Sequence, residues 1–185
     1  MASLIALGHS KRFVKKSKCY SEQFENSLPK LAPSEIEIGR LLGKGGYADV
    51  YEVRSFPLMN NNENEDEGQR EVRHFLQTHV SSQRKGDSRY AVKYLRHDIV
   101  KDDTKFSSAA TSLAIEVKIL CSISHPNIIK LRGLCSHGEM GFCSGTPEGY
   151  FLVFDRLYDT LDQRLAQWRQ QGKKRQGLKL SYVFK

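Results

Sequence analysis

Three groups of residues have the types and spacing that a phosphate-binding site requires. The run Gly43-Lys-Gly-Gly46 can form a tight turn with backbone N–H groups close to an anion, because glycine has no Cβ atom. Lys93 closes the apolar run Tyr90-Ala-Val, and a lysine in such a strand needs an anionic partner where it is buried. Glu116 lies in an otherwise apolar helical pattern, where its carboxylate needs a cation. We therefore expect Lys93 and Glu116 to form an ion pair.

The pattern of polar and apolar residues predicts the elements that carry these groups. Alternation over residues 35–42 and 48–54 predicts two strands that flank the glycines as a hairpin. Three further strands are predicted at residues 88–95, 128–133 and 149–154. Helices are predicted from Ala109 to Ser124, just before Pro126, and over residues 158–171. Five strands with a helix after the third indicate an α+β domain.

Other interpretations exist for each group taken alone. A dinucleotide-binding glycine motif opens a helix, and a Walker loop ends in Gly-Lys-Ser/Thr before one, whereas a strand is predicted after Gly46. Both of these are therefore excluded. The glycines could still form an ordinary tight turn, Lys93 could reach solvent at the end of its strand, and Glu116 could be an exposed helix residue.

In their order along the chain, the three groups resemble the protein kinase family. The segment Leu42-Gly-Lys-Gly-Gly-Tyr-Ala-Asp-Val50 fits the family's glycine-rich loop, Tyr90-Ala-Val-Lys93 its V-A-I-K strand, and Glu116 its helix-C glutamate. The His125-Pro-Asn-Ile-Ile run after the helix is similar to the family's entry into the fourth strand. The resemblance covers residues 35–172. It implies a kinase N-terminal lobe, with a five-stranded antiparallel sheet and helix C, ending after the hinge and helix D.

The resemblance also implies a role for each matching residue. Lys93 would hold the α- and β-phosphates of ATP and be fixed by Glu116. Phe154 would be the bulky gatekeeper at the back of the pocket, and backbone groups of Asp155 and Leu157 would bond the adenine edge. The resemblance also places a set of residues over the adenine and the phosphates of the nucleotide. They are Leu42, Gly43, Lys44, Gly45, Gly46, Tyr47, Ala48, Val50 and Ala91.

The chain departs from the family pattern in two ways. Ala48 stands where the family's loop often has a third glycine, which stiffens the loop. The segments 56–87, 97–110 and 137–149 are longer than the family's loops, and we expect surface excursions there, since added loop length costs little free energy. Within 56–87, Val72, Phe75, Leu76 and Val80 recur at helical spacing and predict a short helix.

The groups that perform phosphoryl transfer are not in this sequence. No H-R-D-x-x-x-x-N segment and no D-F-G occur among the 185 residues. Those motifs supply the catalytic Asp and the Mg²⁺ ligands, so we expect the Mg²⁺ ligands in a missing C-terminal lobe and no activity from this chain alone. A fragment, a splice form or a genuine short protein would each explain this. The final helix would then expose Leu161, Leu165 and Trp168, which predicts an aggregation-prone chain.

Charge is concentrated at the two ends of the chain. The net charge is +8, and residues 1–20 and 173–185 each contain five cations and no acid. The middle is therefore slightly acidic, which argues against specific nucleic-acid binding by a folded face. We expect a disordered basic tail and linker over 1–34, the kinase-like lobe over 35–172, and a second basic tail, or the start of the missing lobe, over 173–185.

The remaining features restrict the compartment and the partners. The four cysteines form no C-x-x-C pair, and Cys135, His137 and Cys143 match no zinc finger spacing, so we expect free thiols and no metal site. No apolar run is long enough to predict a membrane span. We expect a cytoplasmic protein, with nuclear or organellar targeting through the basic N-terminal segment left open.

These features support three functions. The first is the ATP-binding portion of a protein kinase, with ATP, Mg²⁺ and an unidentified protein substrate as its ligands. Ser/Thr specificity is expected rather than Tyr specificity only because Ser/Thr kinases are more common. The second is a non-catalytic module that binds nucleotide or competes for the regulators of a kinase. The third is an adaptor whose basic tail makes the contacts and whose lobe is a scaffold.

Overall fold

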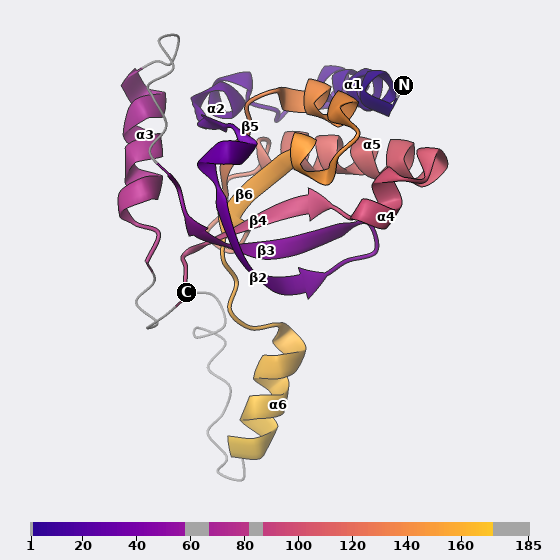
Figure 1. Ribbon diagram of the computed structural model, residues 1–185. Coiled ribbons are helices and arrows are strands. Elements are labelled where there is room, and N and C mark those ends of the chain that lie inside the picture. The colour runs from indigo at the N-terminus through magenta and orange to yellow at the C-terminus, as the bar shows by residue number, and fades with distance from the viewer. Residues whose placement is uncertain (1, 58–66, 82–86, 172–185) are drawn as a thin grey trace.

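One mixed sheet of six strands forms the centre of the structure, a computed structural model that describes residues 2–57, 67–81 and 87–171 (Figure 1). The strands, in the order β1-β5-β6-β4-β3-β2 across the sheet, are β1 (Lys30–Leu31), β2 (Glu37–Lys44), β3 (Ala48–Ser55), β4 (Tyr90–Leu95), β5 (Leu131–Cys135) and β6 (Phe151–Asp155). The pairs among β2 to β6 are antiparallel, as predicted, but β1 pairs parallel with β5. The predicted α+β class is confirmed. The prediction of a five-stranded, purely antiparallel sheet is wrong, because it placed no strand before Glu35.

Helices cover one side of this sheet, and another helix extends away from it. The helices are α1 (Ala2–Lys16), α2 (Glu22–Ser27), α3 (Glu67–Thr78), α4 (His97–Val100), α5 (Asp103–Leu120) and α6 (Leu161–Gln171), with short 3-10 turns at η1 (Pro33–Glu35), η2 (Gly138–Ser144) and η3 (Pro147–Gly149). In Figure 1, α1, α2 and α5 lie above the sheet, whereas α6 extends below it, away from the other elements. Leu161 of α6 is accordingly 62% exposed.

The longest helix, α5, is buried in part through small side chains. Ala110 and Ala114 are completely buried and Val117 is nearly so, and small side chains allow the close packing of α1 along α5. Asp102 caps the helix by accepting a hydrogen bond from the backbone N–H of Lys105 at 3.0 Å.

The helix also begins earlier than its apolar pattern predicted. The expectation of a surface excursion over 97–110 is wrong, since α4 and the first turns of α5 occupy that segment. Ile99 and Phe106 lie in the hydrophobic core there. The Ser- and Thr-rich composition of residues 103–111 concealed the helix, because such residues are weak helix formers.

The N-terminal segment differs most from its prediction. Residues 1–34 were expected to be a disordered tail and linker, but α1, α2 and β1 occupy most of them. Leu28 and Leu31 belong to the hydrophobic core, and Ala6 and Ser10 of α1 are completely or almost completely buried. An ion pair of 2.6 Å between Lys118 of α5 and Glu25 of α2 ties the segment to the rest of the domain.

The segment 137–149 likewise differs from a simple surface loop. Phe142 is 3% exposed and stacks on Tyr150 with ring centroids 4.2 Å apart, so η2 belongs to the core. The helix predicted within 56–87 is confirmed as α3, whose Leu76 is 1% exposed. The residues 58–66, 82–86 and 172–185, the last including the predicted basic C-terminal tail, lie outside the described residues. Within the described ranges, no helix has the length and apolar composition that crossing a bilayer requires.

Candidate functional site

Lys93 and Glu116 form the ion pair that their sequence contexts predicted. The Lys93 Nζ atom lies 2.6 Å from Oε2 and 2.9 Å from Oε1 of Glu116, so the ammonium donates to both carboxylate oxygens. Their side chains are 26% and 35% exposed, which places the pair at the edge of the core and within reach of solvent. An ammonium in this position can bind a further anion, since it has three N–H donors and is partly open.

Strand β4 and helix α5 determine where the side chains of Lys93 and Glu116 point. Lys93 lies in the middle of β4, paired with Val50 on β3 and Leu152 on β6. Paired residues project to the same face of a sheet, so Lys93 shares its face with both. The neighbouring Val92 and Tyr94 project to the opposite face and are buried. Glu116 lies in the last turns of α5, next to the buried Val117.

The glycine-rich hairpin joins β2 to β3 at the end of the same face. The backbone N–H of Gly45 donates to the carbonyl of Ala48 at 2.8 Å, which closes the turn. A Cβ atom on Gly45 would lie 2.8 Å from that same oxygen, so only glycine fits this position without a shift. The Arg96 side chain donates to the Gly45 carbonyl at 3.2 Å and holds the hairpin from the side of β4. Lys44, Gly43, Gly46 and Tyr47 are exposed around it.

Of the residues predicted to cover the adenine, Val50 and Ala91 lie on the Lys93 face, whereas the register gives Leu42 no partner on that face. Ala91 pairs with Phe154 in the register, and both are buried, with 5% exposure each. Val50 is half-buried beside Lys93, and Ala48 at the start of β3 is also buried. Leu42 lies at a bulge of β2, where the register shifts between Leu41 and Gly43.

The chain leaves the sheet after Asp155, where β6 ends, through residues with strong polar contacts. The Asp155 carboxylate accepts two hydrogen bonds from Arg132, at 2.7 and 2.8 Å. This hydrogen-bonded carboxylate raises the pKa of Arg132 above its ordinary value. Leu157 is 71% exposed, and its backbone N–H makes no hydrogen bond within the described ranges. The backbone of Leu157 is therefore accessible to a ligand, whereas the backbone N–H of Asp155 already bonds the carbonyl of Lys130.

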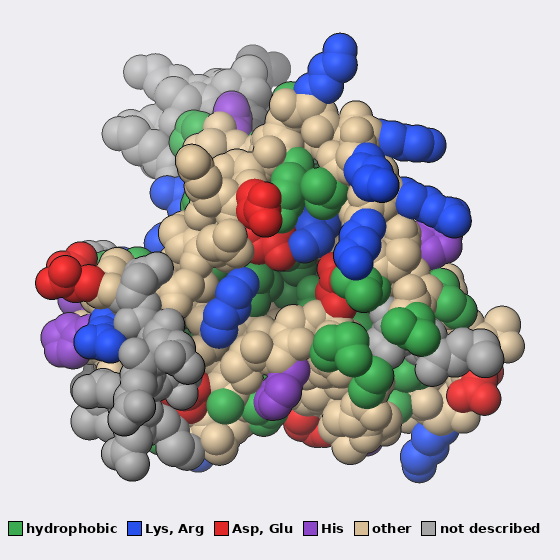
Figure 2. Space-filling view, turned by 90° about the horizontal axis from the view of Figure 1, so that it is seen from above, with side chains coloured by type: hydrophobic (Ala, Val, Ile, Leu, Met, Phe, Trp, Pro, Cys, Tyr) green, Lys and Arg blue, Asp and Glu red, His purple; other side chains and the backbone are tan. Residues whose placement is uncertain are grey.

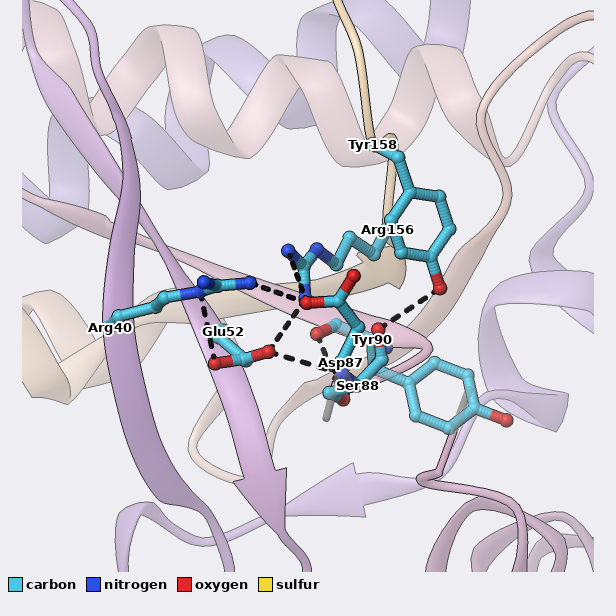
Figure 3. Close-up of polar contacts among 7 residues, drawn as sticks. All are labelled: Arg40, Glu52, Asp87, Ser88, Tyr90, Arg156 and Tyr158. Carbon is cyan, nitrogen blue, oxygen red and sulfur yellow. Dashed lines mark hydrogen bonds and ion pairs between the residues drawn. The ribbon is translucent and has the colours of Figure 1, made fainter. Parts of the chain in front are cut away.

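A cluster of four charged side chains next to this exit was missed by the sequence analysis (Figure 3). Arg156 is 7% exposed and lies 2.6 Å from Oε1 of Glu52 and 3.3 Å from Oδ1 of Asp87. Arg40 closes the cluster from the solvent side, 3.6 Å from Glu52 and in contact with Asp87. We name these four residues the Arg156 cluster. It joins the β2–β3 hairpin to Asp87 and to Arg156 after β6, which lie far from the hairpin in the sequence, so no local pattern could have revealed it.

Backbone contacts extend the Arg156 cluster. The backbone N–H of Ser88 donates to Glu52 at 3.1 Å, and the Tyr158 hydroxyl donates to the Ser88 carbonyl at 3.2 Å. The Arg156 guanidinium also lies over the Tyr158 ring, 5.0 Å from its centroid. Glu52 pairs with Ala91 in the register, two residues along the strands from the Val50–Lys93 pair and on the same face, so the cluster adjoins the site.

One surface cavity of the described part of the chain lies away from Lys93. It encloses about 560 Å³ between α2, α3 and the segment that joins α5 to β5, and its lining includes Phe24, Val72, Ile123 and Leu131. Cys121, which also lines it, is buried, and that burial raises the pKa of its thiol to about 12. The second cavity, of about 380 Å³, lies at η2 and η3. Neither cavity includes Lys93 or Glu116.

Comparison with known proteins gives no family for this chain. No protein-family model matches it, and no curated protein sequence matches it at a significant level.

Proposed function

We propose that this chain is the ATP-binding portion of a protein kinase, in which Lys93 binds the α- and β-phosphates of ATP. The observation that carries the proposal is the Lys93–Glu116 ion pair, formed between β4 and α5 on the sheet face bordered by the glycine hairpin. An ammonium fixed by a carboxylate is held in one place and keeps a donor for phosphate oxygens. A glycine hairpin at the same face supplies the backbone that can cover them.

The position of Lys93 also sets where the adenine and the Mg²⁺ ion of the nucleotide would lie. The adenine would lie against Val50, Ala91 and Phe154, a strip of apolar side chains set by the strand register. Its polar edge would bond the accessible backbone at Leu157. Mg²⁺ would arrive with the nucleotide phosphates, and its protein ligands would come from a C-terminal lobe that this sequence does not contain.

A second function is favoured by the motif content of the sequence. The 185 residues contain no H-R-D-x-x-x-x-N and no D-F-G segment. A chain of these residues alone could bind nucleotide and transfer nothing, acting as a regulatory module. Both functions share the nucleotide site, and transcript sequence that continues past Lys185 into those motifs would distinguish them.

Thermal unfolding in the presence of Mg²⁺ and ATP tests the shared claim. A ligand that binds only the folded state raises the melting temperature with concentration, so the wild-type chain should show a rising shift. Lys93→Met removes the ammonium but keeps the aliphatic stem, and it should abolish the shift. Lys101→Met, which changes an exposed lysine between α4 and α5, is the control and should keep the shift. An equal shift in Lys93→Met and wild type would contradict the proposal.

A further inference from the structure

The outward face of α1 carries cations and exposed apolar residues together. A helix repeats every 3.6 residues, so residues three, four and seven apart share one face. Ala6 and Ser10 define the inward face, which packs on α5 and η2. The residues opposite to them are exposed: Leu4, Ile5, Gly8, Lys11, Arg12, Lys15 and Lys16. We name these seven residues the α1 face. It spans about 20 Å along the helix axis at 1.5 Å per residue.

The cations of the α1 face are unusually free of counter-charges. Residues 1–20 contain no Asp or Glu, and within the described ranges none of Lys11, Arg12, Lys15 and Lys16 takes part in an ion pair. Figure 2 looks onto this side of the molecule and shows lysine and arginine side chains projecting from the part where α1 lies. Cations elsewhere are mostly paired, as Arg132, Lys118 and Arg156 are. The α1 face therefore presents a strong local positive potential.

The apolar end of the α1 face suggests what kind of anion it meets. Leu4 is 67% exposed and Ile5 is 39% exposed, at the end of the helix that precedes the cations. A surface helix that only had to remain solvated would have polar residues at both positions, as it does at Lys11 and Lys15. A ligand for the complete face must therefore offer negative charges and, about 10 to 15 Å away, an apolar layer.

We propose that the α1 face binds the surface of an anionic lipid bilayer. Acidic lipid headgroups attract lysine and arginine side chains, and the boundary of the acyl layer accepts Leu4 and Ile5 beside them. A nucleic acid offers phosphates but no apolar layer, so it would leave Leu4 and Ile5 exposed. The inference is independent of the nucleotide site, because α1 lies on the far side of α5 from the sheet. Because α1 packs on α5, the bilayer would lie next to the helix that holds Glu116.

Co-sedimentation of the complete chain with lipid vesicles tests this proposal. The chain should bind vesicles of phosphatidylcholine containing about a third phosphatidylserine, should bind pure phosphatidylcholine weakly, and should be released by salt. The variant K11Q/R12Q/K15Q/K16Q should bind the anionic vesicles at least tenfold more weakly, because each removed cation contributes a factor of about five near such a surface. Leu4→Ser with Ile5→Ser should lower the salt concentration that releases the chain from anionic vesicles, because the apolar contact is lost.

A matched control removes the same number of charges from the other basic end of the chain. The variant K173Q/K174Q/R175Q/K179Q has the same net charge as the first variant. It should keep most of the wild-type binding to anionic vesicles. Circular dichroism shows whether all variants fold. Equal binding to neutral and anionic vesicles, or full binding by the α1 variant, would overturn the proposal. Tight binding to a soluble RNA or polyglutamate with no vesicle binding would assign the face to a soluble polyanion and overturn it too.

Discussion

The Lys93 ammonium is both held by a carboxylate and partly exposed to solvent. It is buried enough to be held by the Glu116 carboxylate at 2.6 Å, and at 26% exposure it is open enough to meet a ligand. A pair this exposed adds little to stability, about 1 kcal/mol or less. Under the proposed function, the pair serves ligand binding more than stability. Replacing either partner should change ligand affinity more than it changes the melting temperature.

The cysteines provide a test of burial at the residue scale. Burial raises the pKa of Cys121 to about 12, so at pH 8 its thiol stays protonated and unreactive. We expect iodoacetamide to modify the exposed Cys19 and Cys143 quickly at pH 8 and to leave Cys121 unmodified, as peptide mass spectrometry would show. Denaturation in guanidinium should make all four cysteines reactive. Rapid modification of Cys121 in the folded chain would contradict its placement in the core.

At the scale of elements, α5 connects the site to the core, and Asp102 fixes where this helix begins. The backbone N–H of Lys105, and then its ammonium, hold the pKa of Asp102 below its ordinary value. The folded-state pKa is lower than the unfolded one, so the cap's stabilisation is complete above the ordinary carboxyl pKa. It is lost as the pH falls through the lowered value.

Removal of this cap should loosen the first turn of α5. In Asp102→Ala, hydrogen exchange at the amides of Lys105 and Phe106 should become faster at pH 7 than in the wild-type chain. The difference between variant and wild type should shrink as the pH falls, because the wild-type cap protonates. Asp103→Ala changes the next carboxylate, which does not cap the helix, and serves as the control. Unchanged exchange in Asp102→Ala would show that the helix does not depend on this cap.

At the scale of the whole molecule, the Arg156 cluster ties together segments separated by more than 100 residues. Arg156→Met would leave Glu52 and Asp87 partly buried without their main cation, and we expect a loss of about 3 kcal/mol in the free energy of unfolding. Arg40→Met removes the exposed cation of the same cluster and should cost about 1 kcal/mol or less. Urea unfolding of both variants measures the contrast. Equal losses would show that burial does not set the strength of this cluster.

The features that could be predicted from the sequence are those set by residues close to one another in the chain. The glycine hairpin, five strands, α3 and the Lys93–Glu116 contact follow from alternation, turn residues and unpaired charges in apolar segments. The N-terminal segment was missed because its five cations indicated a tail, while the buried face of α1 consists of small residues such as Ala6 and Ser10. Strand β1 has two residues and is defined only by its parallel partner β5. The Arg156 cluster was missed because its members meet only in the folded chain.

The ammonium of Lys93 is proposed to meet the phosphates of ATP, and an acyl-phosphate derivative of ATP tests this contact most directly. Such a probe transfers its acyl group to a lysine amine beside the bound phosphates and releases the nucleotide. Peptide mass spectrometry of the wild-type chain should find the acyl group on Lys93, and excess ATP should prevent it. Acylation that is confined to exposed lysines such as Lys11 and Lys15, with no protection by ATP, would contradict the account.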